Sequence, residues 1–300
     1  MNYKLTYEKH IFNFSKSNTV ALTVSSGDSI EIETMDCFAN QLTTPEDKLE
    51  SMDWDKVNPA SGPIFIREAF KGDTLKVTIE NIRLNNQGVM ASGKDLGVLG
   101  DLLDGLESKL IQIENGKAIF NDKISIPLNP IIGVIGVAPE NEAVNCGTPG
   151  THGGNMDNTM IVEGAVLYLP IFVDGALFAL GDLHAVMGDS EIGVTGIEIA
   201  GTVKVKLDVI KNLIIETPML ENNDYFSTIA SSQTLDDAVA DCTKHMFMLL
   251  SKKLEIPKHE LVMLLSVVGH TQICQVVDPL KTARFIMPKW VLEKYKFNIY

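Results

Sequence analysis

Two short segments combine glycines with histidine and acidic side chains, and they hold the residues of this sequence best suited to chemistry. Residues 146–157 read CGTPGTHGGNMD, and residues 181–191 read GDLHAVMGDSE. Imidazole and carboxylate groups are the ligands of zinc and related divalent ions, which adjacent residues seldom hold alone. Together the segments predict a divalent-metal site. Its candidate ligands are His152, Asp157, Asp182 and His184.

The spacing within the second segment predicts how its polar side chains point. Because side chains alternate along an extended chain, Asp182 and His184 are expected on one face, and Asp189 and Glu191 likewise on one face. A solvated acidic loop is the alternative, and it explains the acidic residues but not a histidine beside an apolar strand. For His152 the alternative is a structural turn in which the ring caps a carbonyl group.

One more acidic residue and one cysteine belong with these candidates. Asp36 lies among apolar residues in the run TMDCF, where burying a bare carboxylate is costly without a partner. A metal ion is one such partner, and Arg67 is the other. Cys146 lies in the first glycine-rich segment, so attack by its thiolate is an alternative to metal chemistry.

The first two thirds of the chain are predicted to be rich in β-strands. Runs of β-branched residues recur between turn-forming pairs such as Gly-Asp and Asn-Gly, at residues 20–24, 30–34, 74–82 and 111–113. Residues 165–173 and 176–180 are predicted to form a hairpin, because the Asp-Gly pair between them suits a two-residue type I′ turn. Residues 194–209 are predicted to form one long strand.

The last third has helical periodicity. Apolar residues spaced by three or four follow Thr234 and predict a helix as far as about residue 254, with Thr234 as its N-cap. A second helix is predicted over residues 257–268. We therefore divide the chain into a β-rich body, residues 1–222, and an α/β portion, residues 223–300. Both can equally belong to one domain, because two helices can cover an open sheet face.

Composition limits the function. The 300 residues are 45% hydrophobic and carry a formal charge of −14, from 25 basic and 39 acidic residues. This charge disfavours nucleic acid and anionic membranes as partners. The four cysteines form no CxxC pair, and the N-terminal residues lack an apolar signal segment, so a cytoplasmic location is expected. Exposed strand edges favour a homodimer.

The longest motifs occupy residues 147–157 and 181–192, and shorter ones occupy residues 27–41, 58–63 and 72–75. In this order they resemble the acetamidase/formamidase family, over about residues 27–288. Departures from the family pattern are modest: Ser61 and Ser190 stand where other members often have Thr and Gly. The resemblance implies a mainly β fold, with a β-sandwich-like body and a smaller C-terminal α/β portion.

The resemblance also implies hydrolysis of the C–N bond of a short, neutral, linear amide such as formamide or acetamide, giving a carboxylic acid and ammonia. A divalent metal would polarise the carbonyl group and activate water, with zinc as the first choice and calcium or manganese as alternatives. Asp182 is either a further ligand or the acceptor that orients His184. The predicted ligands are Asp36, His152, Asp157, Asp182 and His184.

Glu191, or as a second choice Glu142, is expected to move a proton from water to the departing nitrogen. Two alternatives to this mechanism remain open. One is a metal-stabilised β protein that binds a small ligand without turnover. The other is an amidase whose nucleophile is the thiolate of Cys146.

Overall fold

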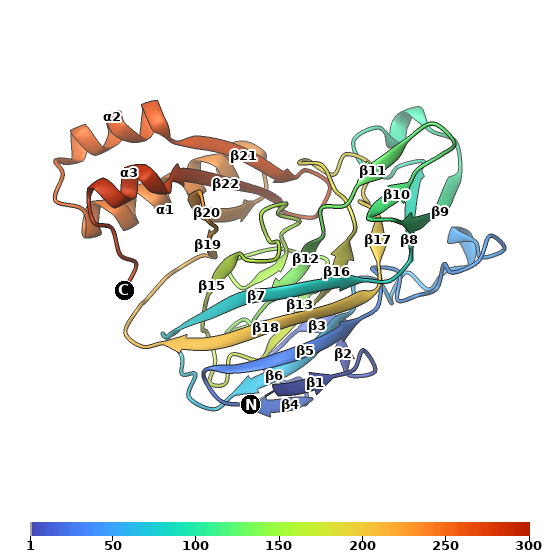
Figure 1. Ribbon diagram of the computed structural model, residues 1–300, viewed down its shortest axis with the longest axis horizontal. Helices are drawn as coiled ribbons and strands as arrows, with labels where there is room; N and C mark the ends of the chain where they lie inside the picture. Colours follow the sequence, from blue (N-terminus) through green and yellow to red (C-terminus); the bar gives the residue numbers. More distant parts are fainter. Residues whose placement is uncertain (1) are drawn as a thin grey trace.

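The computed structural model describes residues 2–300 and consists mainly of two large β-sheets (Figure 1). The first sheet has nine strands and combines strands from both ends of the chain. In spatial order they are β1 (Asn2–Leu5), β5 (Asp28–Thr34), β18 (Gly201–Ile210), β7 (Thr74–Leu84), β15 (Val166–Pro170), β19 (Met219–Glu221), β20 (Tyr225–Ser232), β22 (Lys281–Pro288) and β21 (His270–Gln275).

The second sheet has eleven strands, and it carries the candidate site residues. Its main path runs through β11 (Ser125–Pro127), β10 (Lys117–Ile119), β9 (Leu106–Glu114), β8 (Gln87–Gly93), β17 (Glu198–Ile199), β16 (Phe178–His184), β12 (Ile131–Gly136) and β14 (Gly153–Asn155). Off this path, β6 (Ala60–Ile66) pairs with β16, β2 (His10–Ile11) and β4 (Leu22–Val24). A separate small sheet joins β3 (Asn13–Phe14) to β13 (Val144–Asn145).

Residue patterns explain how the two sheets pack. In β18 the valines Val203 and Val205 are buried, whereas Lys204 and Lys206 are only partly buried. This alternation gives the first sheet one apolar face for the core and one polar face. In the second sheet, β12 and β16 are buried along their whole length. The predicted β-sandwich-like body is thus confirmed, and its central strands lead into the candidate site.

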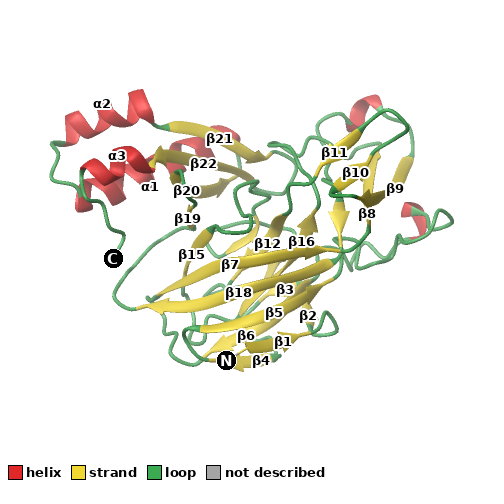
Figure 2. Cartoon of the chain, in the orientation of Figure 1, coloured by secondary structure: helices red, strands yellow, loops and turns green. Residues whose placement is uncertain are grey.

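Helices cover the C-terminal end of the nine-stranded sheet (Figure 2). They are α1 (Leu235–Lys253), α2 (Lys258–Val268) and α3 (Lys289–Lys294), and short 3₁₀ turns occur at Leu49–Ser51 and Gly100–Leu102. In α1 every fourth residue is buried, from Ala238 through Cys242 and Met246 to Leu250. Both predicted helices are confirmed as α1 and α2. The apolar stripe of α1 packs on the sheet. Among residues 2–300, no helix combines the length and apolar character needed to cross a bilayer.

The N-cap of α1 gives a testable contribution to stability. The backbone N–H of Asp237 donates to the hydroxyl of Thr234 at 3.1 Å. Replacing Thr234 with alanine leaves this donor without its cap and should lower the free energy of unfolding by about 1 kcal/mol in urea denaturation. Thr243→Ala in the same helix is the control, because that hydroxyl only bonds back to Val239 O and its loss should cost little. An equal loss in both variants would contradict the capping role.

The predicted hairpin is wrong. Strand β15 pairs with β7 and β19 in the first sheet, whereas β16 pairs with β12, β6 and β17 in the second. The physical reason lies in the connection, where Gly175, Ala176 and Leu177 have φ values of 80°, 58° and 55°. A type I′ turn needs positive φ at two central residues. The third left-handed residue carries the chain over to the other sheet.

The prediction of one long strand over residues 194–209 is also wrong, because this segment forms two strands in different sheets. Its first part is the two-residue strand β17 in the second sheet, and its second part is β18 in the first. The predicted division at residue 222 falls between β19 and β20, which pair with each other. The nine-stranded sheet therefore continues across the proposed boundary, and the division into two domains stays a prediction.

Candidate functional site

His184 lies at the centre of a group of buried acidic side chains, which we call the carboxylate cluster: Asp157, Asp182, Glu191 and Glu198. Each carboxylate approaches the same ring nitrogen. The distances from His184 Nε2 are 3.2 Å to Glu198 Oε2, 3.4 Å to Asp182 Oδ1, 3.7 Å to Asp157 Oδ1 and 4.0 Å to Glu191 Oε1. The two predicted segments, residues 146–157 and 181–191, thus meet at one histidine, as the metal-site prediction requires.

Neighbouring strands of the second sheet bring most of the cluster together. Asp182 and His184 come from the end of β16, Glu198 comes from β17 beside it, and Asp157 follows β14. Between β14 and β16 runs β12, whose Gly133 lies directly beneath the site. A methyl group on Gly133 would collide with the carboxylates of Asp157 and Asp182. Glycine at this position therefore makes room for the two acidic side chains.

The loop that carries Glu191 is fastened to the C-terminal strands. The N–H of Ser190 donates to Cys274 O at 2.8 Å, and the N–H of Val276 donates to Ser190 O at 3.1 Å. Asp189 forms an ion pair with Arg284 at 2.6 Å instead of facing the cluster. The predicted common face of Asp189 and Glu191 is thus wrong. Positive φ values at Ser190 (88°) and Glu191 (49°) break the alternation of an extended chain.

Three members of the cluster have a left-handed backbone. The φ values are 43° at Asp157, 53° at Asp182 and 49° at Glu191. Positive φ is uncommon for residues other than glycine, and such residues gather at active sites and ligand clamps, where the surrounding structure holds them. The backbone of the cluster therefore has the character of a functional site.

Burial and mutual repulsion raise the pKa of three carboxylates of the cluster, whereas His184 holds the pKa of Asp182 below its ordinary value. Burial raises the pKa of Asp157, of Glu191 and of Glu198. For His184, burial lowers the pKa, but the carboxylates of Glu198 and Asp182 outweigh this effect and raise it. A single imidazolium cannot balance four carboxylates in a buried space. The charge is satisfied either by bound protons or by a cation.

The residues present fit a divalent cation. Several buried oxygens have no hydrogen-bond partner within the described residues: both carboxylate oxygens of Asp157, Oδ1 of Asp182 and Oε2 of Glu198. Such atoms are costly to bury unless something binds them. The structure also contains two groups of possible metal ligands, and within each group the ligand atoms lie within 4.8 Å of one another. The first group is Asp157, His184 and Glu191, and the second is Cys37, Asp182 and Glu198.

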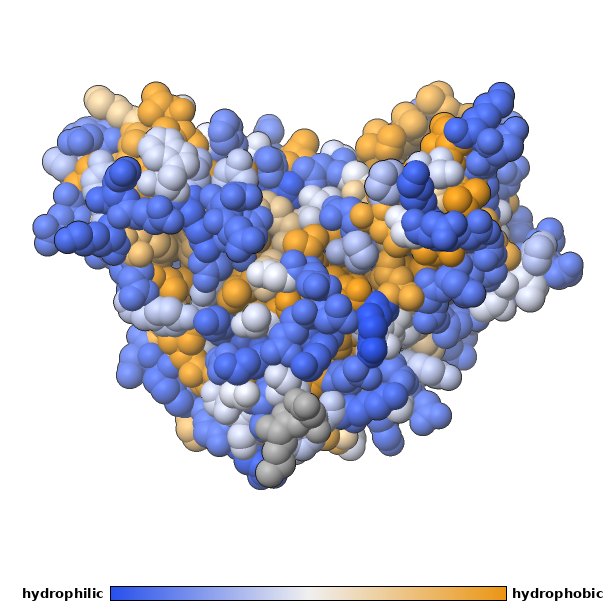
Figure 3. All heavy atoms as spheres, viewed as in Figure 1, coloured by the Kyte–Doolittle hydropathy of each residue, from blue (hydrophilic) through white to orange (hydrophobic). Residues whose placement is uncertain are grey.

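A cavity of 170 Å³ opens on the cluster. Figure 3 shows that the outline of the molecule dips between the end that carries the helices and the end formed by β8 to β11. Apolar and acidic side chains both line the cavity, together with Cys37, Asn58, Asn155 and Thr195. The apolar ones are Phe38, Trp54, Val57, Ala91, Leu96 and Val194, and the acidic ones are Asp182, Glu191, Glu198 and Asp278.

Two predicted ligands lie outside these ligand sets. Asp36 is buried, and its Oδ1 accepts the N–H of Asn40 at 2.8 Å. Burial raises its pKa to about 6, and it lines a different cavity, with Asn40 and Asn85. His152 is buried edge-on against Phe14, with ring centroids 5.2 Å apart. Its Nε2 has no hydrogen-bond partner among residues 2–300, and burial lowers its pKa to about 4.

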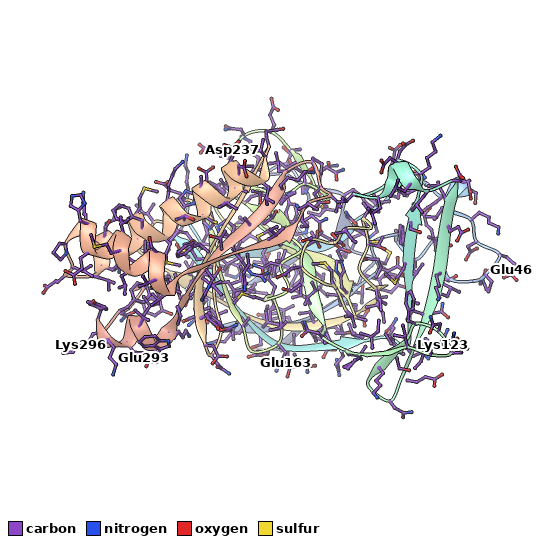
Figure 4. All side chains as sticks on the ribbon, turned by 90° about the horizontal axis from the view of Figure 1, so that it is seen from above. Glu46, Lys123, Glu163, Asp237, Glu293 and Lys296 are labelled. Carbon is purple, nitrogen blue, oxygen red and sulfur yellow. The ribbon has the colours of Figure 1, made fainter. Side chains whose placement is uncertain are left out.

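The structure does not bring Glu142, the second choice for the proton shuttle, to the cluster. Glu142 is exposed and lines a surface hollow with Pro139, Thr151 and Phe172. Another exposed glutamate, Glu163, also lies at the periphery (Figure 4), where its carboxylate accepts from Asn81 Nδ2 at 2.9 Å. Of these acidic residues, only Glu191 reaches both His184 and the cavity.

The alternative nucleophile Cys146 is not in the cavity. Its side chain is buried with Phe14 and Ala60, and its Sγ donates to Ile11 O at 3.6 Å. Burial raises the pKa of the thiol well above its ordinary value. Because the thiolate is the nucleophile, these surroundings disfavour the thiolate alternative.

The sequence reasoning missed Glu198 and Asp278 as site residues. Glu198 stands between Ile197 and Ile199, a pattern that predicts an outward-facing polar residue on a strand. Asp278 stands in the run VDPL, which has the composition of a turn. Neither pattern shows that the residue faces other acidic groups. The one available signal was Glu198 as a lone charge among apolar residues.

Comparisons with known proteins show which family the chain resembles and which fold it shares. A family model described as the acetamidase/formamidase family matches residues 9–147 and 140–238. A predicted acetamidase/formamidase from Thermoanaerobacter tengcongensis is 53% identical with a TM-score of 0.98, and 99% of each chain is covered. An acetamidase from Bacillus halodurans is 44% identical with a TM-score of 0.96, over 98% of this chain and 99% of that one.

A more distant relative gives a partial match. A Schizosaccharomyces pombe protein described as an inferred formamidase is 26% identical over 265 residues, which cover 66% of this chain and 63% of that protein. The match thus spans less than two thirds of the relative's length. The family model, by contrast, matches well over half of the present chain. The chain belongs to the acetamidase/formamidase family.

Proposed function

We propose that this protein hydrolyses the C–N bond of short linear amides to a carboxylic acid and ammonia, at a site that holds a divalent metal ion. The observation that carries the proposal is the buried carboxylate cluster around His184, with its unpartnered oxygens beside a small cavity. Membership of the family supports the reaction, since two of its solved relatives are called acetamidase or predicted acetamidase/formamidase. A cytoplasmic location and a homodimer stay predictions.

Four residues are the best candidates to hold the metal. Glu198 replaces part of the predicted set, because it lies closer to His184 than any other acidic group of the cluster. A divalent cation here supplies Lewis acidity toward the amide carbonyl and toward water. The imidazole, with the Cys37 thiol nearby, favours zinc over calcium, which prefers oxygen ligands. The proposed ligands are Asp157, Asp182, His184 and Glu198.

Glu191 is the proposed proton carrier. It lies farthest of the four carboxylates from His184 Nε2, at 4.0 Å, and it lines the cavity. From this position its carboxylate takes a proton from the attacking water and gives it to the departing nitrogen, which needs that proton to leave as ammonia. Burial and the neighbouring Asp157 raise the pKa of Glu191, and His184 opposes that rise.

The cavity favours a small acyl group. Its 170 Å³ is well below the roughly 300–1,000 Å³ of pockets for drug-sized ligands. Apolar side chains such as Phe38, Val57 and Ala91 line the cavity together with the acidic ones. A short alkyl chain can contact the apolar side chains while the amide group meets the acidic ones.

Metal removal tests the proposal. Purified protein should contain a divalent metal and release ammonia from formamide, acetamide or propionamide, and a chelator should abolish both together. Added zinc, manganese or calcium should restore the activity, whereas a thiol reagent should inhibit little. Elemental analysis and ammonia assays on one preparation check this. Full activity after complete metal loss would overturn the metal mechanism, and bound metal without ammonia release would favour a ligand-binding protein.

A further inference from the structure

Two side chains in the cavity, Asn155 and Asp278, hydrogen-bond to each other, and Asn155 keeps an acceptor that the cluster around His184 does not use. Asn155 is 5% exposed, and its Nδ2 donates to Asp278 Oδ2 at 3.1 Å. Both side chains line the 170 Å³ cavity beside Asp182 and Glu191. The Oδ1 atom of Asn155 is buried and has no partner within the described residues. A buried amide oxygen without a donor is costly, so it points to a ligand that carries an N–H or O–H group.

The Asp278 side of this pair is held in place before any ligand arrives. The buried side chain of Gln275 closes the loop by donating to Leu280 O at 2.7 Å and by accepting the N–H groups of Val277 and Asp278 at 2.9 and 3.0 Å. Lys281 Nζ donates to Asp278 O at 2.6 Å. A group fixed in this way loses little entropy on binding.

We propose that Asn155 and Asp278 form the subsite that receives the amino group of a primary amide, an inference that rests on the proposed function. A primary amide carries two N–H donors on its nitrogen. Asn155 Oδ1 accepts one of them, and the carboxylate of Asp278, which also interacts with Asp157, accepts the other. The leaving nitrogen is thereby placed beside Glu191, which lines the same cavity.

This subsite makes the enzyme selective for primary amides. An N-methyl group replaces one donor, so one acceptor of the subsite stays unpaired in the complex. Sites built to hydrogen-bond a substrate N–H or O–H reject analogues that lack it by a factor of about 10⁴. We therefore expect wild-type kcat/KM for acetamide to exceed that for N-methylacetamide by about this factor.

The test compares the two substrates in Asn155→Ala and Asp278→Asn, with metal content and melting temperature measured on the same preparations. Each variant should lose about 10- to 100-fold in kcat/KM for acetamide, the equivalent of one unmade hydrogen bond, and much less for N-methylacetamide. Bound metal should be unchanged. Asn86→Ala is the matched control, since Asn86 is exposed and lines only the neighbouring cavity; its selectivity should equal that of wild type.

Two results would overturn the subsite alone. One is an active wild type whose preference for acetamide is unchanged in both variants. The other is loss of metal from Asp278→Asn, because Asp278 would then be a metal ligand. A wild type that releases no ammonia from acetamide would instead overturn the proposed function, and the subsite with it.

Discussion

Replacing His184 with alanine should remove both the bound metal and the amidase activity. Asp157, Asp182 and Glu198 all approach Nε2 of His184 within 3.7 Å. Without the imidazole, mutually repelling carboxylates remain and a nitrogen ligand is lost. Changes in residues that merely orient a ligand cost about 10- to 100-fold in metal affinity, so loss of the ligand itself should exceed 100-fold. Metal titration and ammonia release measure the two effects.

His245 provides the control for this prediction. It is partly buried on α1 and lies 3.2 Å from Thr217 Oγ1, at a surface groove beside the helix. His245→Ala should keep both metal and activity. If His245→Ala lost its metal while His184→Ala retained it, the site would be wrongly placed.

Glu191→Gln should lower kcat by about 10²-fold or more while leaving metal content near normal. Glutamine has nearly the shape of glutamate but cannot carry the proton between water and the departing nitrogen. The hydrogen bonds of Ser190 to Cys274 and Val276 hold this loop independently of the Glu191 side chain, so the fold should survive. Turnover and elemental analysis on the same preparation test both parts.

Glu142→Gln is the matched control, because Glu142 is exposed and lines a different surface hollow. It should keep full activity. A Glu191→Gln variant that loses its metal would make Glu191 a ligand, in line with its place beside Asp157 and His184. A variant that keeps both metal and rate would show that Glu191 takes no part in the reaction.

The sequence predicted those secondary-structure elements and site residues that depend on near neighbours in the chain. The helix α1 follows from an apolar stripe and an N-cap, both of which depend on near neighbours in sequence. Asp157, Asp182 and His184 were predictable because glycines and metal-binding side chains gather around them. The connection after β15 was not predictable in the same way. Its Asp-Gly pair suits a hairpin, but Leu177, which follows, has a left-handed backbone. The residue type leucine gives no indication of that conformation.

The remainder of the site depends on which strands become neighbours. Glu198 enters the cluster because β17 pairs with β16, at His184 itself. Asp278 reaches the cavity from the C-terminal strands, more than 80 residues after His184 along the chain. Nothing in the runs around these two residues specifies those pairings, so sequence spacing alone could not assign them to the site.

The continuous nine-stranded sheet has a consequence for protein engineering. If the chain were cut after residue 222, β19 would become an unpaired edge strand, because its partner β20 would be missing. That edge would offer unpaired backbone groups to other chains, and apolar residues such as Tyr168 and Met219, which pack with the C-terminal helices, would face water. Asp278 and Arg284 would also be missing from around the site. The β-rich body is therefore no transplantable catalytic module, and fusions or circular permutations are better opened at an exposed turn than at this junction.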